Sequence, residues 1–423
     1  MEEEGQLVLK IREGQTMKRK KQSSWCSWCL LALIALILQS CVGIGESSTV
    51  KKGDFQVRKT SGGGTLGVNN AAQAAFKGKI YFTYDRNLYV LDGEKKLTQL
   101  TRGMDVRDPA VSPDGKWVAF IKRYQDYSDL MLLPAGGGQP KLLRTGAGSY
   151  LPNPNSPMGA PKSTAIWYAQ PSWQDASHLA FLSDLAKPYT DPGVDNFLLD
   201  LQVFVIAIDD PEATPQTIAY ANYGAGGDRD ASYRPGHTDQ IIYTHYAYDA
   251  TGAQQLTQLY LEDPNAIVNH PGRYRPGATG FAFDPGVAIT PSDQANLQPA
   301  FSPDGNTIAY VRRRDASHMG LYLMGVPEDI TQDPNNPAII KKALEPYAQS
   351  VLIQQQLYIS QPFWSPDGSQ LAYLSYNNNV FDIWLVDITT DPKTKLLIAK
   401  DAPVQLTDAG GHLNADSRPS WIQ

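Results

Sequence analysis

Cysteine is scarce in this sequence. Only Cys26, Cys29 and Cys41 occur among 423 residues, and none follows Cys41. A disulfide scaffold and a cysteine-based zinc site are therefore excluded for the rest of the chain. Basic residues are not in surplus either, because 37 Lys and Arg stand against 43 Asp and Glu, a formal charge of −6. Broad nucleic-acid binding depends on a basic surface and is not expected.

Common catalytic motifs are missing as well. The sequence holds no P-loop, no dinucleotide-binding fingerprint and no Gly-x-Ser-x-Gly nucleophile elbow. Its six histidines do not cluster along the chain, and its aspartate pairs do not have the spacing of a calcium loop. We therefore predict no cofactor, no metal site and no catalytic residue from the sequence.

The first 41 residues have the pattern of a secretory signal peptide. A basic cluster, Lys18–Lys21, precedes an apolar run, Trp25–Leu38, that is short for a membrane-spanning helix. Leu38–Cys41 then resembles a bacterial lipobox, which implies that Cys41 is lipidated and becomes the mature N-terminus. The alternative is an uncleaved anchor helix; both interpretations predict an extracytoplasmic protein attached to a membrane, in the periplasm or at the cell surface.

Residues 42–70 are rich in Gly, Ser, Thr and Lys, so they are predicted to form a flexible tether. The remaining residues, 71–423, are predicted to form one domain. The whole chain contains 35 glycines, 30 prolines and 42 aromatic residues, a composition that favours short strands joined by many turns.

A repeat runs through residues 71–423. Three segments share the pattern Pro-x-x-Ser-Pro-Asp-Gly followed by an apolar strand, and three further segments are degenerate copies of it. The first residue of each copy, which we call the landmark, is in order Pro109, Pro171, Ala231, Pro299, Pro362 and Pro419, at spacings of 62, 60, 68, 63 and 57 residues.

The repeat predicts an all-β fold. Ser-Pro-Asp-Gly fits a tight hairpin turn, since Pro presets the first central position and Gly takes the left-handed one. A third strand follows in most copies and a fourth in some, and four short strands per unit are typical of a β-propeller. Because the chain ends in a lone first-strand copy, Pro419–Trp421, we predict six four-stranded antiparallel blades closed by the C-terminal strand.

These repeats resemble those of the TolB-type six-bladed propellers, a family with WD-repeat-like motifs. The resemblance covers residues 71–423 and rests on the Ser-Pro-Asp-Gly copies at 112–115, 302–305 and 365–368. It implies the propeller fold without implying an activity.

The repeat also predicts a candidate ligand-binding ring. The residue immediately before each landmark is polar, and it shares a strand face with the small residue immediately after the landmark. We expect these residues at one mouth of the central channel: Asp108, Gln170, Asp230, Gln298, Gln361 and Arg418. The alternative is that they are merely solvated, because propeller channels hold water.

Three long connections are predicted to form a partner-binding face. Residues 146–166, 263–297 and 327–360 are each expected to precede the first strand of a blade and thus to emerge together. Tyr168 is among the aromatic residues expected to anchor a protein or glycan partner there.

The sequence therefore favours a membrane-tethered propeller that acts as a protein- or ligand-binding or scaffolding module, without catalysis. One alternative is a hydrolase or lyase acting on polysaccharide or peptide at the channel mouth. Another is a structural subunit of an envelope complex.

Overall fold

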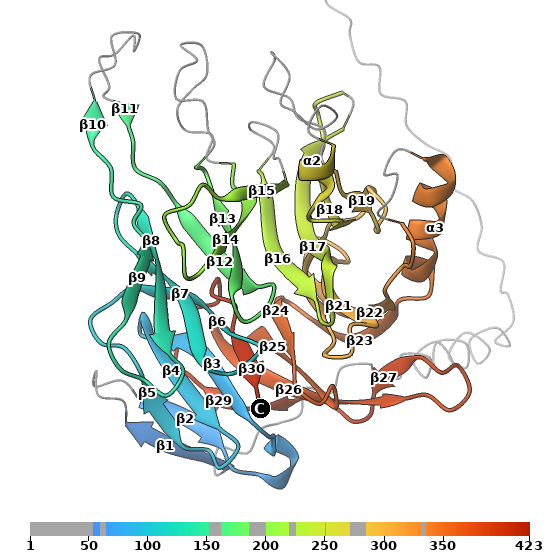
Figure 1. Cartoon of the computed structure of the whole chain (residues 1–423). Helices are drawn as coiled ribbons and strands as arrows, with labels where there is room; N and C mark the ends of the chain where they lie inside the picture. The colour runs from blue at the N-terminus through green and yellow to red at the C-terminus, as the bar shows by residue number, and fades with distance from the viewer. Residues whose placement is uncertain are drawn as a thin grey trace, which may run out of the picture. The chain divides into compact units, whose positions relative to one another are not determined.

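Antiparallel strands make up nearly all of the regular structure. In the computed structural model, the described residues are 54–59, 65–151, 162–185, 200–219, 226–249, 251–270, 285–330 and 336–423. All of them belong to one compact unit, Ser48–Gln423 (Figure 1). The predicted signal peptide and Cys41 lie outside this description. No helix among the described residues has the length and apolar character needed to cross a bilayer.

Six sheets of the described residues have four strands or more, and the four-stranded antiparallel blade is as the repeat predicts. The first two contain, in spatial order, β30 (Ser420–Ile422), β3 (Lys79–Tyr84), β4 (Asn87–Asp92) and β5 (Leu97–Gln99), then β6 (Val106–Val111), β7 (Trp117–Arg123), β8 (Ser128–Pro134) and β9 (Lys141–Arg144). The next two contain β12 (Tyr168–Trp173), β13 (His178–Ser183), β14 (Gln202–Ala207) and β15 (Gln216–Ala219), then β16 (Asp228–Arg234), β17 (His237–Tyr248), β18 (Gln255–Glu262) and β19 (Val287–Ala288).

The last two of these sheets complete the series. One contains β20 (Asn296–Phe301), β21 (Thr307–Arg313), β22 (Met319–Gly325) and β23 (Val351–Gln356); the other contains β24 (Ile359–Trp364), β25 (Gln370–Asn377), β26 (Val380–Thr390), β27 (Leu397–Ala399) and β28 (Val404–Gln405). The first strands β30, β6, β12, β16, β20 and β24 contact one another in a closed circle. Strand β30 pairs with β3, so the C-terminal strand completes the blade that begins the chain's repeat, as expected.

The predicted count of six blades is wrong. Counted by its sheets, the propeller has seven, because β1 (Phe55–Lys59), β2 (Thr65–Asn69) and β29 (Thr407–Asp408) form a further three-stranded sheet. Its strands carry no Ser-Pro-Asp-Gly copy, so the repeat could not reveal it. Leu66 and Val68 on β2 are fully buried in the hydrophobic core next to Leu406, which explains why a segment predicted as tether is ordered here.

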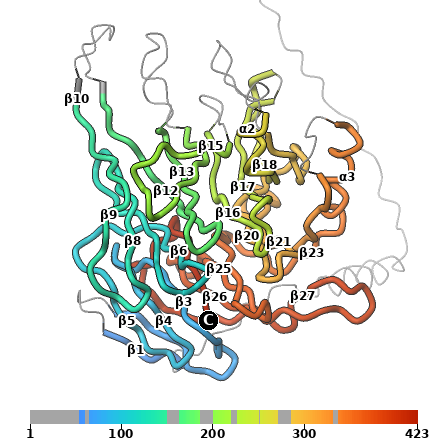
Figure 2. Tube along the Cα trace, in the orientation of Figure 1, coloured from blue at the N-terminus to red at the C-terminus, as the bar shows by residue number. Residues whose placement is uncertain are grey.

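The seventh sheet continues from the outer edge of the β24 blade. Strand β28 pairs with β26, and β29, which follows β28 after one residue, pairs with β2 (Figure 1). Figure 2 labels the two ends of this arrangement, β26 and β1. The seventh sheet therefore adds no strand to the circle of first strands around the channel.

The long connections do not all precede a first strand, so that prediction is also wrong. Only the segment that holds β10 (Tyr150–Leu151) and β11 (Lys162–Ser163) does so in full. Helices α2 (Ala266–Asn269) and α3 (Pro337–Ala348) lie instead between the third and fourth strands of their blades. Helix α3 packs against β19 and β22 through the buried Ala343. A single 3-10 turn, η2 (Ala72–Ala74), precedes β3.

Tyr168 does not anchor a partner, because it is 2% exposed and packs in the core between two blades. The bulky residues two places after the landmarks pack between blades, as Trp173 and Trp364 show. The indole of Trp173 donates to the carbonyl of Ala110 on the preceding blade at 2.9 Å, and that of Trp364 donates likewise to Ala300 at 3.2 Å. The repeat thus encodes both packing and hydrogen bonding between neighbouring sheets.

A buried carboxylate holds the seventh sheet in place. Asp382 on β26 is 2% exposed and accepts hydrogen bonds from the Ala409 amide at 2.7 Å, the Thr407 hydroxyl at 3.0 Å and the Gln405 side chain at 3.0 Å. Burial raises the pKa of Asp382 to about 7, and the Ala409 and Thr407 hydrogen bonds oppose that rise only in part.

This raised pKa predicts a pH-dependent stability. Between about pH 4 and pH 7, Asp382 is protonated in the folded state and ionised in the unfolded chain. The free energy of unfolding should therefore fall as pH rises through that window. We expect Asp382→Asn to flatten the dependence and to recover on the order of a few kcal/mol above pH 7. Urea melts of both proteins at several pH values measure this, with the exposed Asp401→Asn as control. Parallel curves for wild type and Asp382→Asn would exclude the effect.

Candidate functional site

The predicted ring residues share an unusual backbone. Asp108, Gln170, Asp230, Gln298 and Gln361 all have φ between 44° and 58°, the left-handed region that non-glycine residues rarely adopt. In each of these strands the pairing register shifts at this residue and the landmark that follows. Every first strand except β30 therefore carries the same β-bulge, which breaks the simple alternation of side chains assumed in the sequence prediction.

These bulges are tied together by hydrogen bonds between blades, which we call the belt. The side chain of one ring residue accepts from the backbone N–H of the ring residue on the next blade. The Asp108 side chain accepts from the Gln170 N–H at 3.3 Å, and the Gln170 side chain accepts from the Asp230 N–H at 2.6 Å. The Gln298 side chain accepts from the Gln361 N–H at 2.9 Å. Between Asp230 and Gln298 the link is indirect: the Thr244 hydroxyl donates to the Asp230 carboxylate at 3.3 Å and accepts from the Gln298 N–H at 3.0 Å.

The belt changes direction once. Asp108 also accepts from the N–H of Arg418 at 2.9 Å, so its two carboxylate oxygens hold both neighbouring blades. By the pattern of the other copies, the Gln361 side chain should accept from the backbone N–H of Arg418, but that N–H donates to Asp108 instead. The belt is therefore open between Gln361 and Arg418.

Arg418 spans the channel. It belongs to the segment just before β30, yet its guanidinium donates to the carbonyls of Pro171 on β12 at 3.2 Å and Ala231 on β16 at 3.4 Å. Burial raises the pKa of Asp108 to about 6, and the N–H and charge of Arg418 oppose the rise. Burial likewise raises the pKa of Asp230, and the charge of Arg418 opposes it. Arg418 thus supplies the positive charge that two buried carboxylates share.

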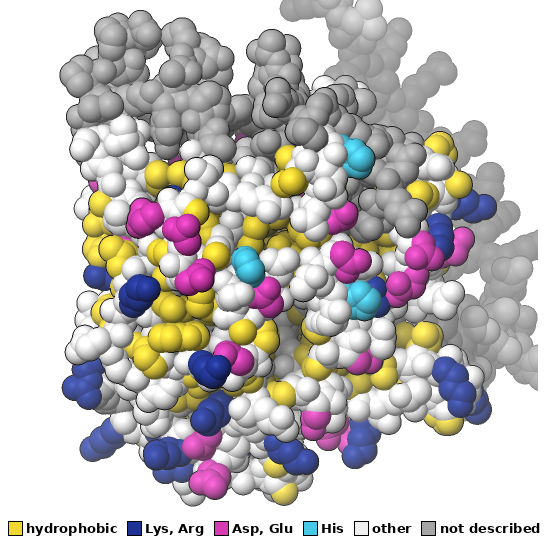
Figure 3. All heavy atoms as spheres, viewed as in Figure 1, with side chains coloured by type: hydrophobic (Ala, Val, Ile, Leu, Met, Phe, Trp, Pro, Cys, Tyr) yellow, Lys and Arg dark blue, Asp and Glu magenta, His cyan; other side chains and the backbone are white. Residues whose placement is uncertain are grey.

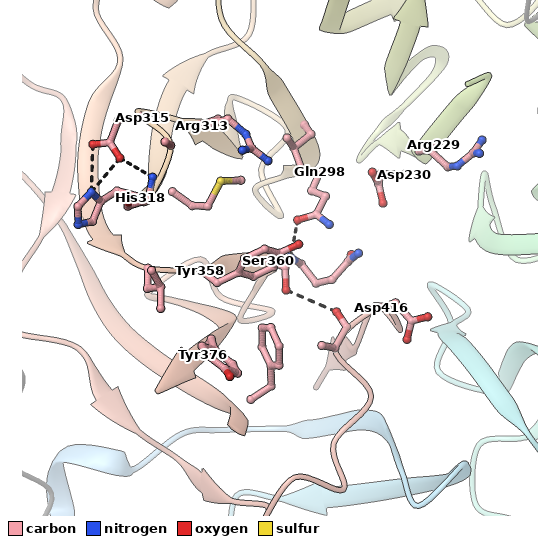
Figure 4. A pocket seen from close by; sticks show the side chains of 18 of the residues that line it. Arg229, Asp230, Gln298, Arg313, Asp315, His318, Tyr358, Ser360, Tyr376 and Asp416 are labelled. Carbon is pink, nitrogen blue, oxygen red and sulfur yellow. Dashed lines mark hydrogen bonds and ion pairs between the residues drawn. The ribbon is translucent and has the colours of Figure 1, made fainter. Parts of the chain in front are cut away.

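A pocket of about 770 Å³ opens beside the belt. Four of the six predicted residues, Gln170, Asp230, Gln298 and Gln361, form part of its wall, whereas Asp108 and Arg418 do not. Figure 4 shows Asp230 and Arg229 on one side of the pocket and Tyr358 and Tyr376 on the other. The sequence prediction therefore located part of the wall, and the belt explains most of its polar residues structurally.

The opposite wall is aromatic. The Phe381 ring lies 5.5 Å from that of Tyr358 and 5.1 Å from that of Tyr376 between centroids. Leu357 and Tyr358 are 55% and 47% exposed, values that are high for side chains of this size. Sequence reasoning missed this wall because its residues lie at strand ends outside the repeated first strand.

The carboxylates in the wall already have partners. Asp315 and His318 form a contact of 3.0 Å, and hydrogen bonds from Ser317 and His318 lower the pKa of Asp315. Asp416 pairs with Arg107 at 2.8 Å, and Asp230 accepts from Gln170 at 2.9 Å. In the part of the chain that the structure describes, no three His, Cys, Asp or Glu side chains are grouped so that they could hold a metal ion.

Charges of both signs occur on the face seen in Figure 3, where Lys and Arg gather toward the lower edge and Asp, Glu and His lie nearer the middle. This face is not a continuous basic surface, in agreement with the acidic balance of the sequence.

Removal of Arg418 should destabilise the ring. We expect Arg418→Met to cost about 2–3 kcal/mol, because two buried carbonyls lose a charged donor. The loss should be larger at pH 8 than at pH 5, since Asp108 ionises near pH 6 and then lacks its nearby cation. Urea denaturation measures both, with the exposed Arg102→Met as the matched control. A loss that is the same at both pH values would show that Arg418 does not stabilise the carboxylates.

No protein-family model matches the chain. Among solved structures, TolB from Acinetobacter baumannii is similar over 87% of this chain and 81% of its own, at 16% identity and a TM-score of 0.47. A putative TolB from Agrobacterium tumefaciens is similar over 82% of this chain and 99% of its own, at 14% identity and a TM-score of 0.43. An oligogalacturonate lyase from Vibrio parahaemolyticus is similar over 82% of this chain and 84% of its own, at 13% identity and a TM-score of 0.41. At these identities the similarity concerns the propeller fold, and TolB structures are among the neighbours that share it.

Proposed function

We propose that this protein is an extracytoplasmic, membrane-tethered β-propeller that binds a partner or ligand in the pocket at the channel mouth. The observation that carries the proposal is the pocket itself, in which an exposed aromatic wall faces the polar residues of the belt. Pockets that combine apolar walls with a few directed polar groups are the usual form of a binding site.

Binding is favoured over catalysis by the state of the carboxylates. Asp230, Asp315 and Asp416 each have hydrogen-bonding or ionic partners within the protein. A general acid or base exchanges its proton with the substrate, whereas these three carboxylates are already held by groups of the protein.

Exposed aromatic and aliphatic side chains support a role in partner recognition. Large apolar residues that stand at the rim of a concave site commonly provide much of the binding energy in an interface. Leu357 and Tyr358 occupy this position, on the connection that leads into β24.

The proposal can be tested by photocrosslinking from the pocket. We expect a benzoylphenylalanine at position 357 to give a discrete adduct in membranes of the source organism, and the same group at Leu142 to give none. Leu142 is similarly exposed, at 48%, but lies on the outer part of strand β9. The adduct at 357 should weaken when Phe381→Ala removes part of the wall. Equal labelling from both positions would contradict a binding site at the channel mouth.

The membrane tether is a separate part of the proposal and rests on the lipobox-like segment Leu38–Cys41. Cys41→Ser should abolish incorporation of a labelled fatty acid and release the protein from the membrane fraction, because the acyl chain provides the anchor. Cys29→Ser, within the apolar run, is the control and should retain the label. If Cys41→Ser remained in the membrane fraction, an uncleaved anchor helix would be the better explanation.

A further inference from the structure

Gln361 is the one ring residue with an acceptor side chain that the belt does not use. It is 3% exposed, it lies in the pocket wall, and its Oε1 has no hydrogen-bond partner in the structure. An unsatisfied buried acceptor costs about 1–3 kcal/mol, so its retention calls for an explanation. The gap in the belt explains why this oxygen is unpaired, because the Arg418 N–H that would donate to it donates to Asp108 instead.

A second unused group lies next to it. The Oε1 of Gln298 accepts from the backbone N–H of Gln361. The Nε2 of Gln298 can still donate, and no described residue accepts from it. Figure 4 shows the Gln298 side chain between the charged and the aromatic walls. The Oε1 of Gln361 is itself buried, and the broad terminal torsion of a carboxamide allows the side chain to turn this oxygen toward the pocket when a ligand binds. The two glutamines then offer one donor and one acceptor side by side.

A hydroxyl group matches this pair. It accepts one hydrogen bond and donates another through the same oxygen, whereas a peptide amide needs two separate groups to do both. The aromatic wall of Tyr358, Phe381 and Tyr376 offers an apolar surface in the same pocket. Arg229 and Arg313 stand against Asp230, Asp315 and Asp416 in the wall, a mixture of charges that favours an uncharged ligand.

We propose that the pocket binds a neutral saccharide, with one hydroxyl placed between Gln298 and Gln361 and a ring face against the exposed ring of Tyr358. Gln361 is then the residue that selects for the hydroxyl. This inference rests on the proposed binding function and specifies its ligand class.

The test uses neutral disaccharides as probes. Maltose, cellobiose, lactose and chitobiose are each added to the intact protein, and binding is followed by saturation-transfer NMR and by titration. N-acetyl-alanyl-tyrosine amide is the matched peptide probe. We expect at least one disaccharide to bind saturably and the peptide to bind no better than background. Binding of the peptide alone, or of none of the probes, would overturn the saccharide assignment.

Two variants separate ligand recognition from folding. Gln361→Met removes the unsatisfied acceptor, so it should lower disaccharide affinity about tenfold while the melting temperature stays at or above the wild-type value. Gln298→Met breaks a belt bond and should lower the melting temperature. Both positions have positive φ, so backbone strain affects them equally. A Gln361→Met protein that binds as wild type, or that melts as low as Gln298→Met, would refute the assigned role.

The two proposals can fail separately. If crosslinking from position 357 marks the pocket as a binding site but no disaccharide binds, the saccharide assignment is wrong and the binding function stands. If crosslinking also gives no pocket-dependent adduct, the binding function itself is wrong.

Discussion

The ring depends on one repeated interaction, in which the side chain of a polar residue on one first strand accepts the backbone N–H of its equivalent on the next. A left-handed backbone at a non-glycine residue costs roughly 1–2 kcal/mol, and five such residues surround the channel. Their strain persists because each of them takes part in at least one belt bond. The bulge turns the N–H of each residue toward its neighbour, so the conformation that costs free energy is also the one that makes the bond possible.

The belt explains why the channel is polar without being an open ligand site. Asp108 and Asp230 are buried acceptors, and burial alone would expel such charges. Directed N–H groups and the guanidinium of Arg418 offset that penalty. The polar residues that the repeat places at the mouth are therefore chiefly structural, and only a few of them keep hydrogen-bonding capacity that the belt does not use.

The repeat predicted what is local and recurrent. The Ser-Pro-Asp-Gly turns, the first strands and closure by Trp421 follow from the spacing of chemically distinct residues. The seventh sheet was beyond this reasoning, since β1 and β2 have no recurring motif and their burial depends on Leu406, more than 300 residues later. The aromatic wall was missed for a related reason: Tyr358, Phe381 and Tyr376 meet only when three separate strand ends come together.

The candidate site follows from a departure from the repeat rather than from the repeat itself. Six equivalent first strands could close a belt in which every acceptor is used. Here Asp108 has two oxygens and satisfies two donors, so one acceptor is left over at the opposite end of the series. A carboxamide at position 108 would have one acceptor oxygen, whereas the carboxylate uses a separate oxygen for each neighbouring blade. The choice of aspartate at one blade thus leaves Gln361 unpaired at another, where the aromatic wall adjoins it.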